Sequence, residues 1–143
     1  MTLLIPTDFS VASQLALQYG ISFLQDRKEK GEILLLNTYL LPNASPDRLI
    51  GLHDELRNKS ALKLKEQVGL AQNAILDHRI SFEILSRMGS FDNVIAHLAQ
   101  ERKVDGVIFG LDGTPREKEK IAKMLDRIHC PLIVVPFEKL NLS

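Results

Sequence analysis

Short apolar segments alternate along this chain with longer amphipathic segments. The short segments are rich in Val, Ile and Leu, which is typical of strands that are buried on both faces of a parallel sheet. They cover residues 2–6, 33–36, 80–85, 106–109 and 132–135. We therefore predict five strands at these positions.

The longer segments repeat their apolar residues at spacings of three and four, as helices do when one face lies on a core. The predicted helices cover residue 10 to about 30, 47 to about 76, 90 to about 102 and 115 to about 127. In the second helix the apolar stripe lapses at Asn58, Lys59 and Ser60, so we expect a bend or break there. Strands that alternate with helices form βαβ units with right-handed crossovers. The sequence therefore predicts an α/β fold, doubly wound around a five-stranded parallel sheet with helices on both faces.

Size, charge and cysteine content narrow the class of protein. The 143 residues leave no room for a second domain beside the predicted elements, so we expect one domain over residues 1–143. Lys plus Arg and Asp plus Glu number 18 each, and this balance argues against sequence-independent binding of nucleic acid. No segment approaches the roughly 20 apolar residues of a membrane span. The lone Cys130 is interpreted as a buried structural thiol, and we expect a cytoplasmic protein with no membrane or nucleic-acid partner.

Polar residues and glycines follow the first and fourth predicted strands. In doubly wound sheets, ligands bind at the carboxyl ends of the strands, where the strand order reverses. If the first and fourth strands are neighbours there, Thr7 and Asp8 lie opposite the turn from Gly110 to Gly113, and Thr38 borders the site. The Thr7 hydroxyl and Asp8 carboxylate could then bind a ribose or a base. The two glycines, which precede a helix N-terminus, would let backbone N–H groups approach a phosphate.

The same residues also have a purely structural interpretation. Asp8 or Ser10 would cap the first helix. Thr114 and Glu117 have the spacing of a capping box, and Pro115 stands at the favoured first position of the last helix. The local sequence leaves both interpretations open.

The remaining polar residues do not indicate a catalyst. The histidines lack the spacing of metal ligands and are His53, His78, His97 and His129. Neither a Ser-His-Asp nor a Cys-His arrangement can be assembled from the sequence. The charged run at 116–120 mixes both signs, and we interpret it as a solvated helix face. We therefore expect no metal site and no catalytic residues.

Taken together, these motifs resemble the universal stress protein family. Residues 4–10, Leu-Ile-Pro-Thr-Asp-Phe-Ser, are similar to that family's first strand and turn. Gly89-Ser90, followed by residues 104–110 and Gly113, resembles its third helix and fourth strand, and residues 129–136 resemble its fifth strand. The resemblance spans nearly the whole chain in the right order.

The resemblance implies a Rossmann-like sheet, related to adenine nucleotide alpha hydrolases, with strand order 3-2-1-4-5. It also implies a homodimer that pairs fifth strands, through the edge formed by Leu132, Ile133, Val134 and Val135. One branch of the family binds ATP. By position, the residues implied for nucleotide binding are Pro6, Thr7 and Asp8 facing adenosine, Thr38 near the base, and Gly110 and Gly113 with Thr114 at the phosphates.

The chain departs from the ATP-binding branch after its second glycine. In that branch nine residues follow, and then a Gly-Ser or Gly-Thr pair that binds the phosphates. Here the tenth residue after Gly113 is Lys123, inside a helical stripe, and the sequence contains no later glycine. The helix N-terminus alone would contribute on the order of 1 kcal/mol per ligand charge.

Three functions follow from these observations. The first is a non-catalytic regulatory or binding module that binds ATP weakly or not at all. The second is a nucleotide-binding stress protein for ATP or AMP, with slow ATP hydrolysis, in which Gly110, Gly113 and the helix start suffice. The third is a domain like those of response regulators or electron-transfer flavoproteins, for which only Asp8 and Asp112 offer acidic groups at strand ends.

Overall fold

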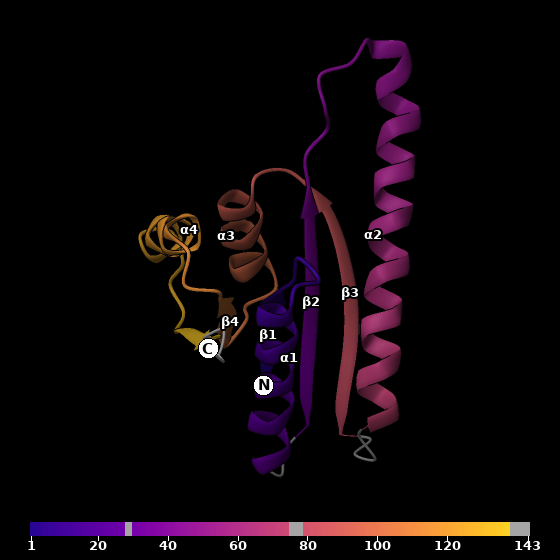
Figure 1. The fold of residues 1–143 in the computed structure, drawn as a ribbon. Coiled ribbons are helices and arrows are strands. Elements are labelled where there is room, and N and C mark those ends of the chain that lie inside the picture. The colour runs from indigo at the N-terminus through magenta and orange to yellow at the C-terminus, as the bar shows by residue number, and fades with distance from the viewer. Residues whose placement is uncertain (28–29, 75–78, 138–143) are drawn as a thin grey trace, which may run out of the picture.

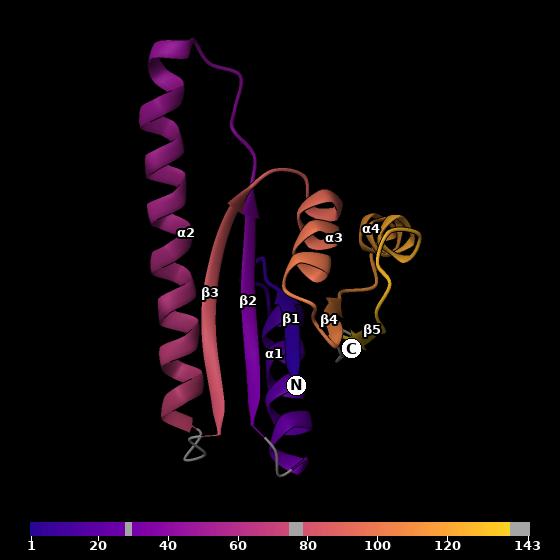
Figure 2. The same ribbon diagram turned by 180° about the vertical axis from the view of Figure 1, so that it is seen from behind.

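The computed structural model describes residues 1–27, 30–74 and 79–137. A parallel sheet lies between two layers of helices (Figures 1 and 2). The elements, in chain order, are β1 (Thr2–Pro6), α1 (Val11–Asp26), β2 (Gly31–Tyr39), α2 (Pro46–Ala74), β3 (Ile80–Met88), α3 (Phe91–Glu101), β4 (Gly106–Leu111), α4 (Pro115–Leu125) and β5 (Leu132–Pro136). The strand order is β3-β2-β1-β4-β5, and every pairing is parallel. The predicted fold and strand order are confirmed. The predicted end of the second helix near 76, and His78, lie outside the described residues.

Both faces of the sheet are apolar, and this is why helices cover both. In β1, Leu3 and Ile5 belong to the core cluster beneath α1 and α2, whereas Leu4 belongs to the cluster beneath α3 and α4. β2 alternates in the same way, with Ile33 and Leu35 on the first side. Successive side chains of a strand point to opposite faces, so a run without polar residues must be covered on both.

β2 and β3 are longer than the apolar pattern predicts. Their pairing runs from Gly31 opposite Ile80 to Tyr39 opposite Met88. Polar side chains such as Asn37 occupy the last part of β2, where the backbone still pairs with β3. The apolar runs therefore mark the more buried part of these strands and miss the residues that extend the pairing beyond it.

The predicted break in the second helix is wrong, because α2 runs without interruption from Pro46 to Ala74. Ser60, where the apolar stripe lapses, is buried at 5% exposure and hydrogen-bonded. Its Oγ donates to Asn37 Oδ1 at 2.8 Å and lies 2.7 Å from Ser86 Oγ. A polar residue at this position therefore joins the helix to β2 and β3 instead of ending it.

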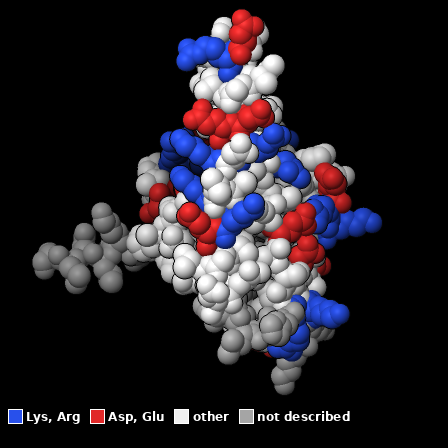
Figure 3. All heavy atoms as spheres, turned by 90° about the vertical axis from the view of Figure 1, so that its right-hand side faces the viewer, with Lys and Arg blue, Asp and Glu red and all other residues white. Residues whose placement is uncertain are grey.

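The first part of α2 and the linker before it extend beyond the ends of the strands (Figure 1). The side of the molecule that α2 forms carries basic and acidic groups interspersed, so it presents no field of one sign (Figure 3). Among the described helices, the 29-residue α2 included, none has the combination of length and hydropathy that crossing a membrane requires.

We expect Ser60→Ala to destabilise the protein by about 1–3 kcal/mol, because Asn37 Oδ1 and Ser86 Oγ lose the hydroxyl that they contact in the interior. Urea unfolding followed by circular dichroism measures this loss. The matched control is Ser22→Ala, on the exposed side of α1, which reports only the gain in helix propensity and should shift stability by less than about 0.5 kcal/mol. Equal stabilities of the two variants would contradict a structural role for the Ser60 hydroxyl.

Candidate functional site

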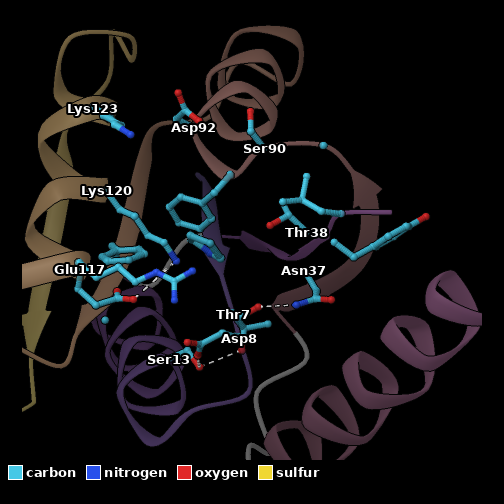
Figure 4. A pocket seen from close by; sticks show the side chains of 18 residues that line it. Thr7, Asp8, Ser13, Asn37, Thr38, Ser90, Asp92, Glu117, Lys120 and Lys123 are labelled. Atoms are coloured by element: carbon cyan, nitrogen blue, oxygen red, sulfur yellow. Dashed lines mark hydrogen bonds and ion pairs between the residues drawn. The ribbon is translucent and has the colours of Figure 1, made fainter. Parts of the chain in front are cut away.

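A cavity of about 420 Å³ opens at the carboxyl edge of the sheet (Figure 4). Its walls come from the β1–α1 turn, the end of β2, the start of α3, the end of β4 and one face of α4. Strand order reverses between β1 and β4, which is where doubly wound sheets bind ligands. The volume lies toward the lower end of the roughly 300–1,000 Å³ that is usual for small-molecule sites.

The turn after β1 forms the first wall of the cavity. Ser10 caps α1 as predicted, since its Oγ accepts from the Ser13 backbone N–H at 3.3 Å. Asp8 Oδ1 accepts from the Ser10 N–H at 3.0 Å and from Ser13 Oγ at 3.1 Å. Burial raises the pKa of Asp8, but the hydrogen bonds from Ser10 and Ser13 together lower the pKa by more, so the result lies below its ordinary value. The turn therefore presents a fixed carboxylate to the cavity.

The Thr7 hydroxyl is used within the turn. It donates to Ser13 Oγ at 3.0 Å and accepts from the Phe9 N–H at 3.0 Å. Phe9 has a φ of 66°, a left-handed conformation that a residue with a side chain seldom adopts. Lys63 of α2 lies over its ring at 5.3 Å. Thr7 thus stabilises a strained turn, and its hydroxyl is already engaged there.

The end of β2 forms the second wall. The Asn37 amide donates to the Thr7 carbonyl at 2.8 Å, and its oxygen accepts from Ser60. Thr38 follows and lines the cavity beside it (Figure 4). The hydrogen bonds of Asn37 tie the turn after β1 to α2, so this helix helps to hold the Asp8 wall in place.

Gly110 lines the cavity for a reason that differs from the predicted one. A Cβ at this position would lie 2.1 Å from the Ala12 carbonyl oxygen, so the missing side chain lets the first turn of α1 pack directly on β4. Gly113 has a φ of 85° and belongs to the turn before α4. Neither Gly113 nor Thr114 is among the residues that line the cavity. Of the predicted nucleotide-binding residues, the structure brings together Pro6, Thr7, Asp8, Thr38 and Gly110.

The N-terminus of α4 is already capped by its own residues. Thr114 Oγ1 accepts from the Glu117 N–H at 3.3 Å, and Asp112 Oδ1 accepts from the Thr114 N–H at 2.9 Å. Pro115 stands at the start of the helix, as predicted. The backbone donors that the sequence offered for a phosphate are therefore partly engaged in the cap.

The charged run at 116–120 is not simply a solvated helix face, because Arg116, Glu117 and Lys120 line the cavity together with Lys123. Glu117 Oε1 lies 3.7 Å from Lys120 Nζ, and the Glu117 side chain is only 13% exposed. Burial raises the pKa of Glu117, and Asp112 and Asp8 add to this, while Lys120 partly offsets it. The sequence signal for this helix face is the spacing of its cations at 116, 120 and 123. The intervening glutamates hide that spacing in the sequence.

The start of α3 closes the cavity from above in Figure 4. Lys120 Nζ lies 5.1 Å from the centre of the Phe91 ring, which packs edge-on against Phe109 of β4. Asp92 pairs with Arg127 at 3.0 Å. Burial raises the pKa of Asp92, but Arg127 and the hydrogen bonds from the Asp92 backbone and Ser90 together lower the pKa by more, so the net direction is downward. The Asp92 charge is thus matched by a cation outside the cavity lining.

Comparisons with known proteins agree on one family. A sequence model of the universal stress protein family matches residues 1–136. Among proteins with curated descriptions, none matches the sequence significantly.

Solved structures of similar fold come from the same family. A universal stress protein from Lactobacillus plantarum is 18% identical, with a TM-score of 0.75 over 94% of this chain and 97% of that one. A family protein from Arabidopsis thaliana with AMP bound is 15% identical, with a TM-score of 0.71 over 99% and 94% of the two chains. A universal stress protein in complex with cAMP is 18% identical, with a TM-score of 0.66 over 95% and 96%. At these identities the likeness concerns the fold.

We expect Gly110→Ala to destabilise the protein by more than about 2 kcal/mol, because the added methyl group meets the backbone of α1. Chemical unfolding measures the loss. The control is Gly69→Ala in α2, where a Cβ meets nothing within 4 Å and should stabilise the helix by about 0.5–1 kcal/mol. A stable Gly110→Ala variant would contradict the packing explanation.

Proposed function

Because the chain belongs to the universal stress protein family, we propose that it is a single-domain, non-catalytic module that binds an adenine nucleotide in this cavity, with at most weak affinity for ATP. The observation that carries the proposal is the cavity itself, at the reversal of the strand order, with the Asp8 carboxylate on one wall and cations of α4 on another. By position, Asp8 would bind the ribose, Thr38 would lie near the base, and Pro6 and Gly110 would supply backbone contacts.

Two neighbours of similar fold support an adenine nucleotide as the ligand class. The Arabidopsis protein has AMP bound, and a second protein is in complex with cAMP. Each of these ligands carries a single phosphate. The capped start of α4, with Gly113 outside the cavity, offers no loop to wrap a triphosphate, which is why we propose weak binding of ATP.

The groups on the Asp8 wall favour binding over catalysis. The lowered pKa of Asp8 makes its carboxylate a weak general base at neutral pH. The Thr7 hydroxyl donates a hydrogen bond to Ser13 Oγ, which is not a general base. The alternative, an ATP-binding stress protein with slow hydrolysis, would require Mg²⁺-dependent affinity for ATP and release of phosphate.

We also propose a homodimer formed through β5. This strand pairs with β4 along one side and lies at the edge of the sheet, where Val134 is 37% exposed. An apolar edge strand tends to pair with another chain, and a second β5 would satisfy its backbone groups. We place the protein in the cytoplasm, where the lone Cys130 stays reduced; burial raises the pKa of this thiol and limits its reactivity.

Isothermal titration with adenosine, AMP and ATP, each with and without Mg²⁺, tests the nucleotide proposal. We expect AMP to bind at least tenfold more tightly than MgATP. Asp8→Ala should weaken AMP binding by about tenfold, the effect of losing one hydrogen bond to a charged group. Asp54→Ala, an exposed carboxylate of α2, is the control and should change nothing. Tight Mg²⁺-dependent binding of ATP with phosphate release would favour the hydrolytic alternative.

Light scattering after size exclusion tests the dimer. The wild-type chain should elute as a dimer, and Val134→Lys should shift it toward monomer. The free-energy cost of burying a lysine charge between the paired strands exceeds the free energy gained from their pairing. Leu62→Lys, at a 62% exposed position of α2, is the matched control and should remain dimeric. A monomeric wild type, or a Val134→Lys variant that stays dimeric, would argue against this edge.

A further inference from the structure

α4 presents a row of cations to the cavity. Arg116, Lys120 and Lys123 are separated by four and three residues, so they share one face of the helix. All three line the cavity, and Figure 4 shows Lys120 and Lys123 pointing from α4 toward it. The row lies at the same edge of the sheet as the turn of Gly113, after which the sequence contains no further glycine.

The acidic neighbours do not neutralise this row. Lys120 lies 3.7 Å from Glu117, whose ionised form is disfavoured by burial. Lys123 lies 4.0 Å from Glu119, and both of these side chains are more than half exposed, so the pair contributes little. Asp8 stands on the opposite wall and is held by Ser10 and Ser13. The described lining holds three cations and three carboxylates, but Asp92 is paired with Arg127 outside the lining and Asp8 lies on the opposite wall, so the α4 wall is the side of the cavity that attracts an anion.

The charge of the cavity favours a small anion over a large one. A phosphate monoester carries a charge of about −1.5 to −2 at neutral pH, and it can lie against the three cations of the α4 wall, away from Asp8 on the opposite wall. A triphosphate would place further negative charge near Asp8 and Glu117 and would need Mg²⁺ or backbone donors to compensate. The backbone of α4 is capped by Thr114 and Asp112, so the compensation would have to come from side chains.

We propose that Arg116, Lys120 and Lys123 hold the phosphate of a nucleoside monophosphate without a divalent cation. The inference rests on the proposed function, because the base and ribose need the walls formed by Asp8 and Thr38. Lysine acts here as a point charge, and the Arg116 guanidinium can bind two phosphate oxygens at once. Phosphate recognition thus comes from side chains of a helix face, while nucleoside recognition comes from the sheet edge.

Titration calorimetry with adenosine, AMP and inorganic phosphate, all without Mg²⁺, tests the inference on the full chain. Wild-type protein should bind AMP at least tenfold more tightly than adenosine. Lys120→Met and Lys123→Met keep the aliphatic stem and should each weaken AMP binding by about tenfold, with adenosine affinity unchanged within about twofold. Glu117→Gln should strengthen AMP binding, the opposite sign. Lys118→Met, exposed on α4 and outside the lining, is the control and should bind like wild type.

The possible results separate this inference from the proposed function. If adenosine and AMP bind equally, or if the Lys120→Met/Lys123→Met double variant still prefers AMP, the cations are not the phosphate site, although nucleoside binding stands. If inorganic phosphate binds and the double variant loses it while adenosine does not bind at all, the nucleotide proposal fails and the cationic site stands. If neither nucleoside nor phosphate binds to a folded wild-type chain, both proposals fall.

Discussion

The burial of β1 from both sides is the constraint on which the rest of the molecule depends. Leu3, Leu4 and Ile5 are 2%, 0% and 0% exposed, and they alternate between the two core clusters. A strand of this kind can lie only in the middle of a sheet covered on both faces, which places β4 and β2 beside it. The polar residues that follow β1 then meet the ends of its neighbours at one edge, and the cavity forms there.

The cavity joins two walls that are built in different ways. The wall after β1 is rigid. Asp8, Ser10 and Ser13 are hydrogen-bonded to one another, Asn37 donates to the Thr7 carbonyl, and Ser60 of α2 donates to Asn37. The wall on α4 consists of long charged side chains on a helix with one fully buried residue, Met124. A fixed hydrogen-bonding surface suits the nucleoside part of a ligand. Long, adaptable cations suit a phosphate, whose charge is constant but whose position can vary.

The sequence predicts the fold well because hydrophobic periodicity marks every buried segment, and the resemblance supplies the strand order. The sequence-based prediction fails at Ser60, because the hydrophobic pattern cannot show that Asn37 of β2 and Ser86 of β3 are its hydrogen-bond partners. Asp8 and Gly110 are found because they lie at or just beyond the carboxyl ends of the predicted strands. Lys120 and Lys123 are missed because their place in the cavity lining depends on how α4 lies against α3, which no local pattern records. Glycines attract a phosphate interpretation, yet Gly110 is explained by packing.

The contact of Gly110 with the Ala12 carbonyl limits how this site can change over generations. No residue larger than glycine fits at position 110 without moving α1, so ligand preference cannot be altered by substitution there. The exposed positions of α4 accept substitution at little cost to the fold. Selection, or a protein engineer, can therefore exchange the charged wall while the floor stays as it is. Divergence among descendants of this chain should accumulate on the helix and spare the glycine.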